Sequence, residues 1–455
     1  MSEQRQSLHE EWSSRWMFIL AAAGSAIGLG NIWKFPYIVG QNGGGAFVLM
    51  YLCFIVAIGV PVMMSEVMVG RRGRRNPVDS LVVLTSESNR SSLWQITGWM
   101  GIIAGLMVMF YYGVIAGWSV DYVVLAATGA FSGRSPTEVQ GLFDGLMNNP
   151  LRMMFWNTVI IAATAFVVAR GVKSGLEKTV RFMFPAILVL LLVVVIYSIN
   201  TGAFQQGFEF LFKPDFSKLT AKGALIALGH AFFTLSLGQG AIMMYGAYLP
   251  KRVSIGGSIL FIAAADTLVA LMAGLAIFPI VFANGLPAGS GPGLLFQTVP
   301  IAFGQMPYGS FFATLFFIMV VFAAFTTTIA LVEPSVVWLM ERFKFKRVKT
   351  TVGVSFVIWF FSIGSVLSFN YWKDISFFGY TYFYFIDNLT ANLMLPIGAV
   401  ITAIFVGWMM RTVYVKEELN IQNPWVFNAW RFAVRFIVPV AITLVVLNAF
   451  GIVQF

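Results

Sequence analysis

The chain has very few charged residues, cysteines and histidines, and each shortage excludes a class of protein. Cys53 is the only cysteine among 455 residues, so neither an internal disulfide nor a cysteine-based metal site is possible. His9 and His230 are the only histidines, which argues against a zinc or haem centre. Charged residues make up only 11% of the chain. An ordinary soluble enzyme is therefore not expected.

Long apolar runs fill the chain, and hydrophobic residues make up 58% of it. This composition is typical of a polytopic, all-α membrane protein. Eleven runs reach the length of a membrane span. They lie near residues 17–40, 44–69, 96–127, 153–169, 180–200, 223–248, 254–283, 308–340, 350–369, 380–410 and 431–453.

The net charge of +10 reflects topology. Most Lys and Arg residues fall in alternate loops, for example at Arg71, Arg72, Arg74 and Arg75 after the second run. The positive-inside rule then predicts a cytoplasmic N-terminus and an external C-terminus. The basic surplus does not indicate a nucleic-acid-binding face.

The first apolar run is interrupted between Gly24 and Pro36 by three glycines, Asn31 and Lys34. Each Gly in a helix costs about 1 kcal/mol relative to Ala. Backbone groups freed within a bilayer must be bonded by protein, ions or ligand. The interruption therefore predicts a binding site, although a kink at Pro36 with tight glycine packing is the alternative.

The sixth run carries a similar interruption, from His230 to Gly240. These two runs open successive groups of five, and interrupted spans in corresponding positions point to an inverted-repeat transporter with a midplane site. We expect one transmembrane domain over residues 1–455. Its first repeat covers about 12–200, its second about 222–411, and an extra helix covers about 431–453.

Isolated polar residues mark other runs. Asp266 lies among alanines, where an unpaired carboxylate is costly, or is protonated, unless a cation lies against it. Thr326 and Thr327 offer hard oxygen ligands that suit an alkali cation, but hydrogen bonding to their own helix is the alternative. Glu66 is either functional or anchored to the arginines that follow it.

The interrupted runs resemble those of a known family. The stretch GSAIGLGNIWKFP, followed by QNGGGAF from Gln41, resembles the neurotransmitter:sodium symporter family and its bacterial amino-acid transporters. FFTLS in the sixth run and FAAFTTT in the eighth fit as well. The match runs from about Trp12 to the end of the tenth run. It implies the fold of a bacterial leucine transporter: eleven transmembrane helices, two inverted five-helix repeats, and broken first and sixth helices.

The resemblance implies an amino-acid site between the two broken helices. Backbone N–H groups at Leu29 and Gly30 and the Tyr112 hydroxyl would meet the substrate carboxylate, which a helix N-terminus favours. Carbonyls of the two broken helices would meet the amino group. The residues implied in substrate binding are Ala26, Leu29, Gly30, Val108, Tyr112, Phe233, Thr234, Ser236, Gln239, Thr327 and Leu331.

The resemblance also implies two sodium ions and no organic cofactor. The first ion would be held by Ala26, Asn31, Thr234, Asp266 and the substrate carboxylate. The second would be held by Gly24, Ile27, Ala323, Thr326 and Thr327. Because the first ion and the substrate are mutual ligands, each raises the affinity for the other.

Three positions bear on the substrate and the anion. Amine-transporting relatives carry a carboxylate where this chain has Gly28, so the substrate should bring its own carboxylate. Gln239 departs from the usual apolar residue and is able to hydrogen-bond a polar side chain or an indole. Asp266 replaces a frequent asparagine, and its charge predicts transport that does not depend on chloride.

Two gates are implied. On the outer side Lys34 would pair with Asp387 above Tyr112 and Phe233, more loosely than the arginine of most relatives. On the inner side Trp12 would plug the pathway, and Glu341 would accept a basic residue. That residue is either His9, which would give a weak or pH-sensitive latch, or Arg5.

These observations predict a sodium-coupled symporter that imports a neutral, hydrophobic or aromatic L-amino acid by alternating access. We expect it in the cytoplasmic (inner) membrane of a prokaryote, with the monomer sufficient for transport. The alternative is a membrane sensor that binds amino acids in a sodium-linked manner without transport. A membrane enzyme is disfavoured because the buried residues offer neither a nucleophile and base nor a metal cluster.

Overall fold

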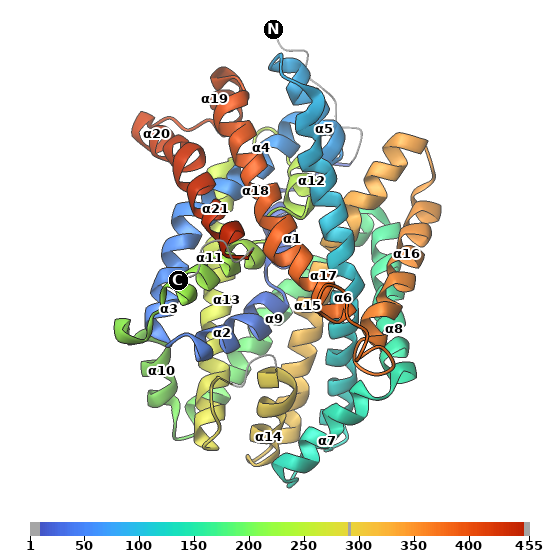
Figure 1. Cartoon of the computed structure of the whole chain (residues 1–455), viewed down its shortest axis with the longest axis vertical. Coiled ribbons are helices and arrows are strands. Elements are labelled where there is room, and N and C mark those ends of the chain that lie inside the picture. The colour runs from blue at the N-terminus through green and yellow to red at the C-terminus, as the bar shows by residue number, and fades with distance from the viewer. Residues whose placement is uncertain (1–9, 290–292, 450–455) are drawn as a thin grey trace.

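The computed structural model of this chain describes residues 10–289 and 293–449. Within these ranges all regular secondary structure is helical, apart from one isolated bridge between Phe377 and Tyr380. Figure 1 shows a tall bundle in which most helices run along the long axis. The expectation of an all-α protein is confirmed.

The first half of the chain supplies ten α-helices. They are α1 (Arg15–Ala26), α2 (Phe35–Gln41), α3 (Gly45–Phe54), α4 (Val60–Gly73), α5 (Pro77–Glu87), α6 (Ile96–Ala127), α7 (Pro136–Met147), α8 (Pro150–Ala169), α9 (Lys178–Ile199) and α10 (Phe204–Phe212). Short π-helical turns join several of them without a change of direction, for example over Ile55–Gly59 between α3 and α4.

The second half supplies eleven more. They are α11 (Ala221–Thr234), α12 (Ala241–Ala247), α13 (Ile255–Ala283), α14 (Val299–Gly304), α15 (Gly309–Phe343), α16 (Arg347–Leu367), α17 (Tyr382–Asp387), α18 (Leu395–Ile404), α19 (Thr412–Leu419), α20 (Pro424–Phe432) and α21 (Val438–Ala449).

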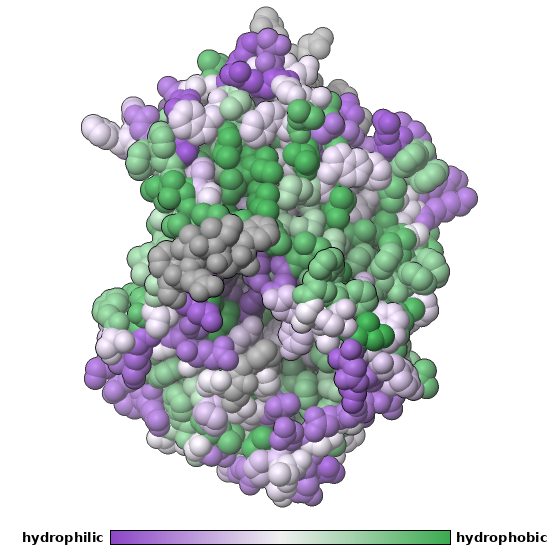
Figure 2. Space-filling model, viewed as in Figure 1, coloured by the Kyte–Doolittle hydropathy of each residue, from purple (hydrophilic) through white to green (hydrophobic). Residues whose placement is uncertain are grey.

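The core of the bundle is formed around α6 and α15, which pack along each other. They have 32 and 35 residues, so each extends about 50 Å at 1.5 Å per residue, more than a bilayer requires. Large apolar side chains such as Val56, Phe182 and Phe356 remain exposed on the outside. Figure 2 shows hydrophobic residues gathered over the upper half of one face, below a hydrophilic tip. This pattern fits a protein surrounded by lipid.

Nine helices of the described residues are long and apolar enough to span a membrane, and a tenth span forms if the bent pair at residues 15–41 is counted as one. The expected count of eleven is therefore only partly reproduced. The difference is the sixth run, residues 223–248, where helix ends at Thr234 and resumes at Ala241. An eleventh crossing made of α11 and α12 remains a prediction, as does the inverted repeat.

The two interruptions have clear backbone causes. Helix α1 ends where Ile27 takes a ψ of 91°, and the axis then bends by 46° before helix resumes at Gly30. Between α11 and α12 the chain adopts a left-handed conformation at Gly238 and Gly240, both with φ of +73°. Glycine adopts such angles without steric cost, so these residues stop the helix. The first span is broken as the sequence predicted.

Candidate functional site

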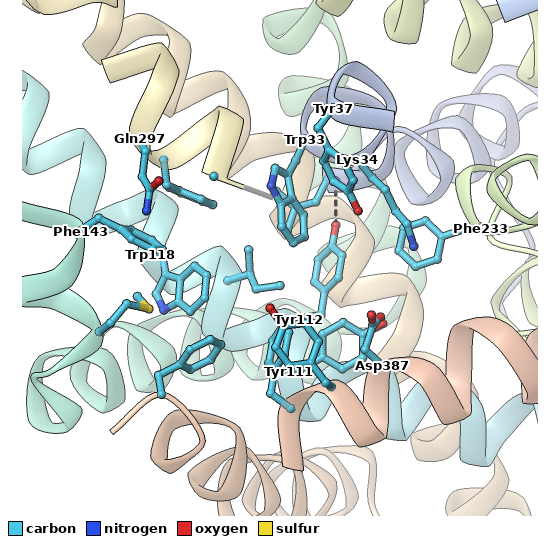
Figure 3. A pocket seen from close by; sticks show the side chains of 18 residues that line it. Trp33, Lys34, Tyr37, Tyr111, Tyr112, Trp118, Phe143, Phe233, Gln297 and Asp387 are labelled. Atoms are coloured by element: carbon cyan, nitrogen blue, oxygen red, sulfur yellow. Dashed lines mark hydrogen bonds between the residues drawn. The ribbon is translucent and has the colours of Figure 1, made fainter. Parts of the chain in front are cut away.

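The break in the first span frees backbone groups that other elements then bond. In an unbroken helix the Leu29 N–H would donate to the Ser25 carbonyl. It donates instead to the Tyr112 hydroxyl of α6, at 3.1 Å (Figure 3). The Gly28 N–H likewise donates to Oδ1 of Asn31, at 3.2 Å. The site therefore contains backbone dipoles released from helical hydrogen bonding.

The released Ser25 carbonyl joins the two breaks to α15. It accepts a hydrogen bond of 2.9 Å from Oγ of Ser236 in the sixth-run break. It also accepts one of 3.1 Å from Oγ1 of Thr327 in α15. Ser236 has a φ of +54°, so its position depends on the broken backbone. Sequence reasoning missed Ser25, although the i to i+4 rule applied to the break would have identified its free carbonyl.

A small cavity of about 10 Å³ lies at this junction, enough for about one water molecule. The structure brings nine of the eleven predicted substrate-binding residues together around it: Ala26, Gly30, Val108, Tyr112, Phe233, Ser236, Gln239, Thr327 and Leu331. Ser25 and Gly28 complete the lining. Leu29 lies at the larger cavity above, and Thr234 lies beside Asp266. The predicted roles of these residues in binding remain predictions.

Gly28 is held against two side chains of this cavity. A Cβ added there would lie 2.5 Å from Oγ1 of Thr327 and 2.7 Å from the Tyr112 hydroxyl. No real Cβ contact is that short, so a side chain at position 28 would displace one of these groups. The space that a longer residue would need is thus already filled by hydroxyl groups.

Asp266 of α13 is completely buried, and neutral donors surround its carboxylate. Nδ2 of Asn31 donates to Oδ1 at 2.8 Å, and Oγ1 of Thr234 lies 3.2 Å from both carboxylate oxygens. The Tyr51 hydroxyl donates to Oδ2 at 3.4 Å. Among the described residues no basic side chain forms an ion pair with it. A buried charge of this kind calls for a cation.

The donor set around Asp266 fits an alkali ion. The Asp266 carboxylate and the Thr234 hydroxyl offer the hard oxygen ligands that such cations prefer, whereas Asn31 turns its Nδ2 toward this carboxylate and its Oδ1 toward the Gly28 N–H. Within the described residues there is no cluster of three or more His, Cys, Asp or Glu side chains that would favour a transition metal instead. Three of the four residues predicted for the first sodium site, Asn31, Thr234 and Asp266, are thus adjacent.

The second group of predicted sodium ligands lies where α1 ends beside α15. A Cβ added at Gly24 would lie 3.5 Å from Cβ of Thr326, so the two helices touch there. Oγ1 of Thr326 and Oγ1 of Thr327 donate to the Ala323 carbonyl at 3.0 and 3.3 Å. The alternative of hydrogen bonding within the helix therefore occurs. It leaves lone pairs on both hydroxyls, so it does not exclude ion binding.

A larger cavity of about 400 Å³ opens above Tyr112 and Phe233. Figure 3 shows Trp33, Lys34 and Tyr37 on one side and Tyr111, Tyr112 and Asp387 on another, with Trp118 and Phe143 at the far end. Most of this aromatic lining was not predicted, because it combines side chains from segments that lie far apart along the chain. We call this space the vestibule.

The expected ion pair across the vestibule is not formed. Lys34 and Asp387 both line it, but among the described residues no salt bridge joins them. Nζ of Lys34 lies instead 4.3 Å from the centre of the Phe233 ring, a cation–π contact (Figure 3). The lysine charge thus lies against the aromatic ring, and no Lys34–Asp387 ion pair bridges the vestibule.

The opposite end of the site is packed around Trp12, and its role as a plug stays a prediction. Trp12 is buried, its indole N–H donates to the Tyr245 carbonyl at 3.0 Å, and its backbone N–H donates to the Tyr248 carbonyl at 3.0 Å. Both tyrosine rings meet the indole edge-on. These partners are more than 230 residues away along the chain, and no sequence signal indicated them.

Other contacts hold the segment around Trp12 in place. Ser13 binds Glu177 through its backbone N–H and its hydroxyl, at 2.7 and 2.8 Å. Glu341, predicted to accept a basic residue, accepts hydrogen bonds of 3.0 and 2.9 Å from the backbone and side chain of Asn76. His9 and Arg5, the two candidates for that basic residue, lie outside the described residues.

Glu66 does not anchor the arginines that follow it. Its Oε1 accepts a hydrogen bond of 2.7 Å from the Gly238 N–H in the sixth-run break. Arg71 pairs instead with Glu418 of α19, at 2.9 Å. The alternative that Glu66 is merely anchored to its neighbouring loop was therefore wrong, and the residue supports the break.

Comparison with known proteins gives matches along nearly the whole chain. The model of the Sodium:neurotransmitter symporter family matches residues 9–138 and 142–455. The sodium-dependent transporter YhdH of Bacillus subtilis (strain 168) is 38% identical, with all of both chains covered. A sodium-dependent transporter of Haemophilus influenzae is 32% identical, with 98% of each chain covered. The crystal structure of MhsT in complex with L-phenylalanine superimposes with a TM-score of 0.90, at 38% identity over 97% of this chain and all of that one.

Proposed function

Because the chain belongs to the sodium:neurotransmitter symporter family, we propose that it imports a neutral, hydrophobic or aromatic L-amino acid by sodium-coupled symport. The family is one of transporters, so the chain is not an enzyme. Two of its relatives are named as sodium-dependent transporters. The amino-acid substrate is supported by MhsT, which was crystallised with L-phenylalanine.

One observation carries this proposal: among the described residues, the buried Asp266 carboxylate has only neutral hydrogen-bond partners. Asn31 and Thr234, which bond it, belong to the two broken spans that also line the cavity. A sodium ion at Asp266 and an amino-acid carboxylate at the Leu29 and Gly30 N–H groups would therefore share one junction. Binding of one then raises the affinity for the other.

The substrate is an amino acid rather than an amine because no side chain replaces its carboxylate. Gly28 leaves no carboxylate in the cavity, and Tyr112 and Thr327 fill the space beside it. The backbone N–H groups at the break and the Tyr112 hydroxyl are the donors for a carboxylate that the ligand brings. The aliphatic side chains of Val108 and Leu331 favour an apolar substrate side chain.

Alternating access is supported by the difference between the two ends of the site. The vestibule is open above Tyr112, whereas Trp12 is buried among Tyr245 and Tyr248 at the other end. We propose that the vestibule faces outside, with the N-terminus in the cytoplasm, in the inner membrane of a prokaryote. We further propose that a second sodium ion is held near Thr326 and Thr327, and that the monomer is sufficient.

Binding and uptake together test the proposal. Purified full-length protein is titrated with a panel of amino acids in sodium and then in potassium, and is also reconstituted into vesicles with a sodium gradient. We expect binding only in sodium and uptake driven by the gradient. Binding that is indifferent to sodium would refute the coupling. Sodium-dependent binding without any uptake would identify a sensor instead.

A further inference from the structure

Gln239 lies in a backbone segment that is packed between α18 and α6. Gly238 and Gly240 flank it, both in the left-handed conformation. A Cβ on Gly238 would lie 2.4 Å from the Leu395 carbonyl, so α18 presses on the segment from one side. Gly101 and Gly105 of α6 approach from the other side, and a Cβ on Gly105 would lie 2.9 Å from the Gln239 carbonyl. Substrate binding therefore cannot easily move this residue away.

Gln239 is 3% exposed and lines the small cavity together with Val108 and Leu331. Among the described residues its Oε1 has no hydrogen-bond partner. A buried carbonyl oxygen without a partner is uncommon, because it has lost its water without receiving a replacement. Leu or Met would fill the same volume without burying an unsatisfied oxygen. The amide therefore requires an explanation beyond packing.

We infer that Gln239 is a specificity-determining residue, and that it selects a neutral amino acid whose side chain is mostly hydrocarbon but carries one N–H or O–H donor. Val108 and Leu331 would cover the hydrocarbon part, and Oε1 of Gln239 would accept from the donor. Indole, phenol and the threonine hydroxyl have this chemistry. The inference rests on the proposed function, which it narrows.

The same selection follows if a water molecule bonds Oε1 before the substrate arrives. The cavity has room for about one water. A substrate donor would replace the hydrogen bond of the displaced water, whereas a purely hydrocarbon side chain would remove the water and leave the oxygen unpaired. Sites that contain a buried hydrogen-bonding group reject analogues lacking the matching group more strongly than apolar pockets reject a small change in size.

Pairs of ligands with equal shape test this inference. Purified full-length protein in sodium is titrated with tyrosine and phenylalanine, with tryptophan and its sulfur isostere 3-benzothienylalanine, and with threonine and valine. For the pair of suitable size we expect the donor-bearing member to bind roughly tenfold more tightly, as one buried hydrogen bond predicts. In Gln239→Leu the hydrocarbon member should bind as tightly or more tightly.

Leu331→Val is the matched control, because it changes the apolar wall and keeps the amide. It should shift the affinity for both members of a pair alike. Gln239→Met serves as a second variant if Gln239→Leu folds poorly. The ratio of the wild-type affinities for the two members of a pair tests the inference even without a variant.

A wild-type preference for the hydrocarbon member, or a donor preference that both Gln239 variants keep, would overturn the inference while leaving sodium-dependent symport intact. If none of the six ligands binds in a sodium-dependent manner, the proposed function is overturned and this inference with it.

Discussion

Nδ2 of Asn31, in the first broken span, donates a 2.8 Å hydrogen bond to the carboxylate of Asp266 in α13. The same asparagine accepts from the Gly28 N–H through its Oδ1. One side chain thus connects the carboxylate to the backbone that would receive the substrate. A change in the charge or position of Asp266 is therefore expected to change the affinity for the substrate.

Asp266→Ala should remove most of the sodium affinity. The substitution takes away the only charged side chain of the proposed first site, and Asn31 and Thr234 lose a common partner. We expect sodium to raise the melting temperature of the wild type. The variant should need at least a tenfold higher sodium concentration for the same rise. Asp374→Asn is the control, since Asp374 is an exposed carboxylate elsewhere. Equal sodium titrations for the two variants would contradict the assignment.

Gly28→Ala should weaken amino-acid binding without unfolding the protein. The added methyl group would lie 2.5 Å from Oγ1 of Thr327 and 2.7 Å from the Tyr112 hydroxyl, and must displace one of them. We expect at least a tenfold loss of affinity, about 1.4 kcal/mol, in sodium-dependent ligand titrations. Gly353→Ala is the matched control, because its Cβ meets no atom within 4 Å. Unchanged affinity in Gly28→Ala would show that the substrate binds elsewhere.

Trp12→Ala should loosen the closed end of the site. The indole is buried against Tyr245 and Tyr248 and donates to the Tyr245 carbonyl, so its removal takes away both packing and a hydrogen bond. We expect faster hydrogen exchange of the amides in α12, measured by mass spectrometry. Trp16→Ala is the control, since Trp16 is 56% exposed. The interpretation of Trp12 as a plug fails if the two variants exchange alike.

Uptake by the wild type should not require chloride. The Asp266 carboxylate is fixed beside Tyr51 by a 3.4 Å hydrogen bond, so a negative charge is built into the site. Replacing chloride with gluconate on both sides of the vesicle should change the initial rate of sodium-driven uptake by less than about twofold, as no ion of the cycle is lost. A collapse of uptake in gluconate would show that the carboxylate does not serve in place of an anion.

The sequence was informative where local chemistry decides the structure. The clusters of glycine and polar residues at 24–34 and 236–240 mark both interruptions, and Gly238 and Gly240 take a positive φ that other residues rarely adopt, so the breaks and most of the lining of the small cavity were predictable. Contacts across the bundle were not. The tyrosines around Trp12 and the aromatic lining of the vestibule depend on how distant helices pack. The pair Lys34 and Asp387 illustrates a further limit, because the Phe233 ring takes the lysine in a contact that charge complementarity alone does not reveal.

The shared carbonyl of Ser25 has a mechanical consequence. It receives hydrogen bonds from Ser236 and from Thr327, so a single oxygen atom couples the two broken spans to α15. If the two broken spans move as one rigid body relative to α15, the hydrogen bond from Ser236 is kept and the hydrogen bond from Thr327 is lost. After such a motion neither group is left unbonded, because the Ser25 carbonyl keeps the Ser236 hydroxyl and Oγ1 of Thr327 also lies 3.3 Å from the Ala323 carbonyl of its own helix.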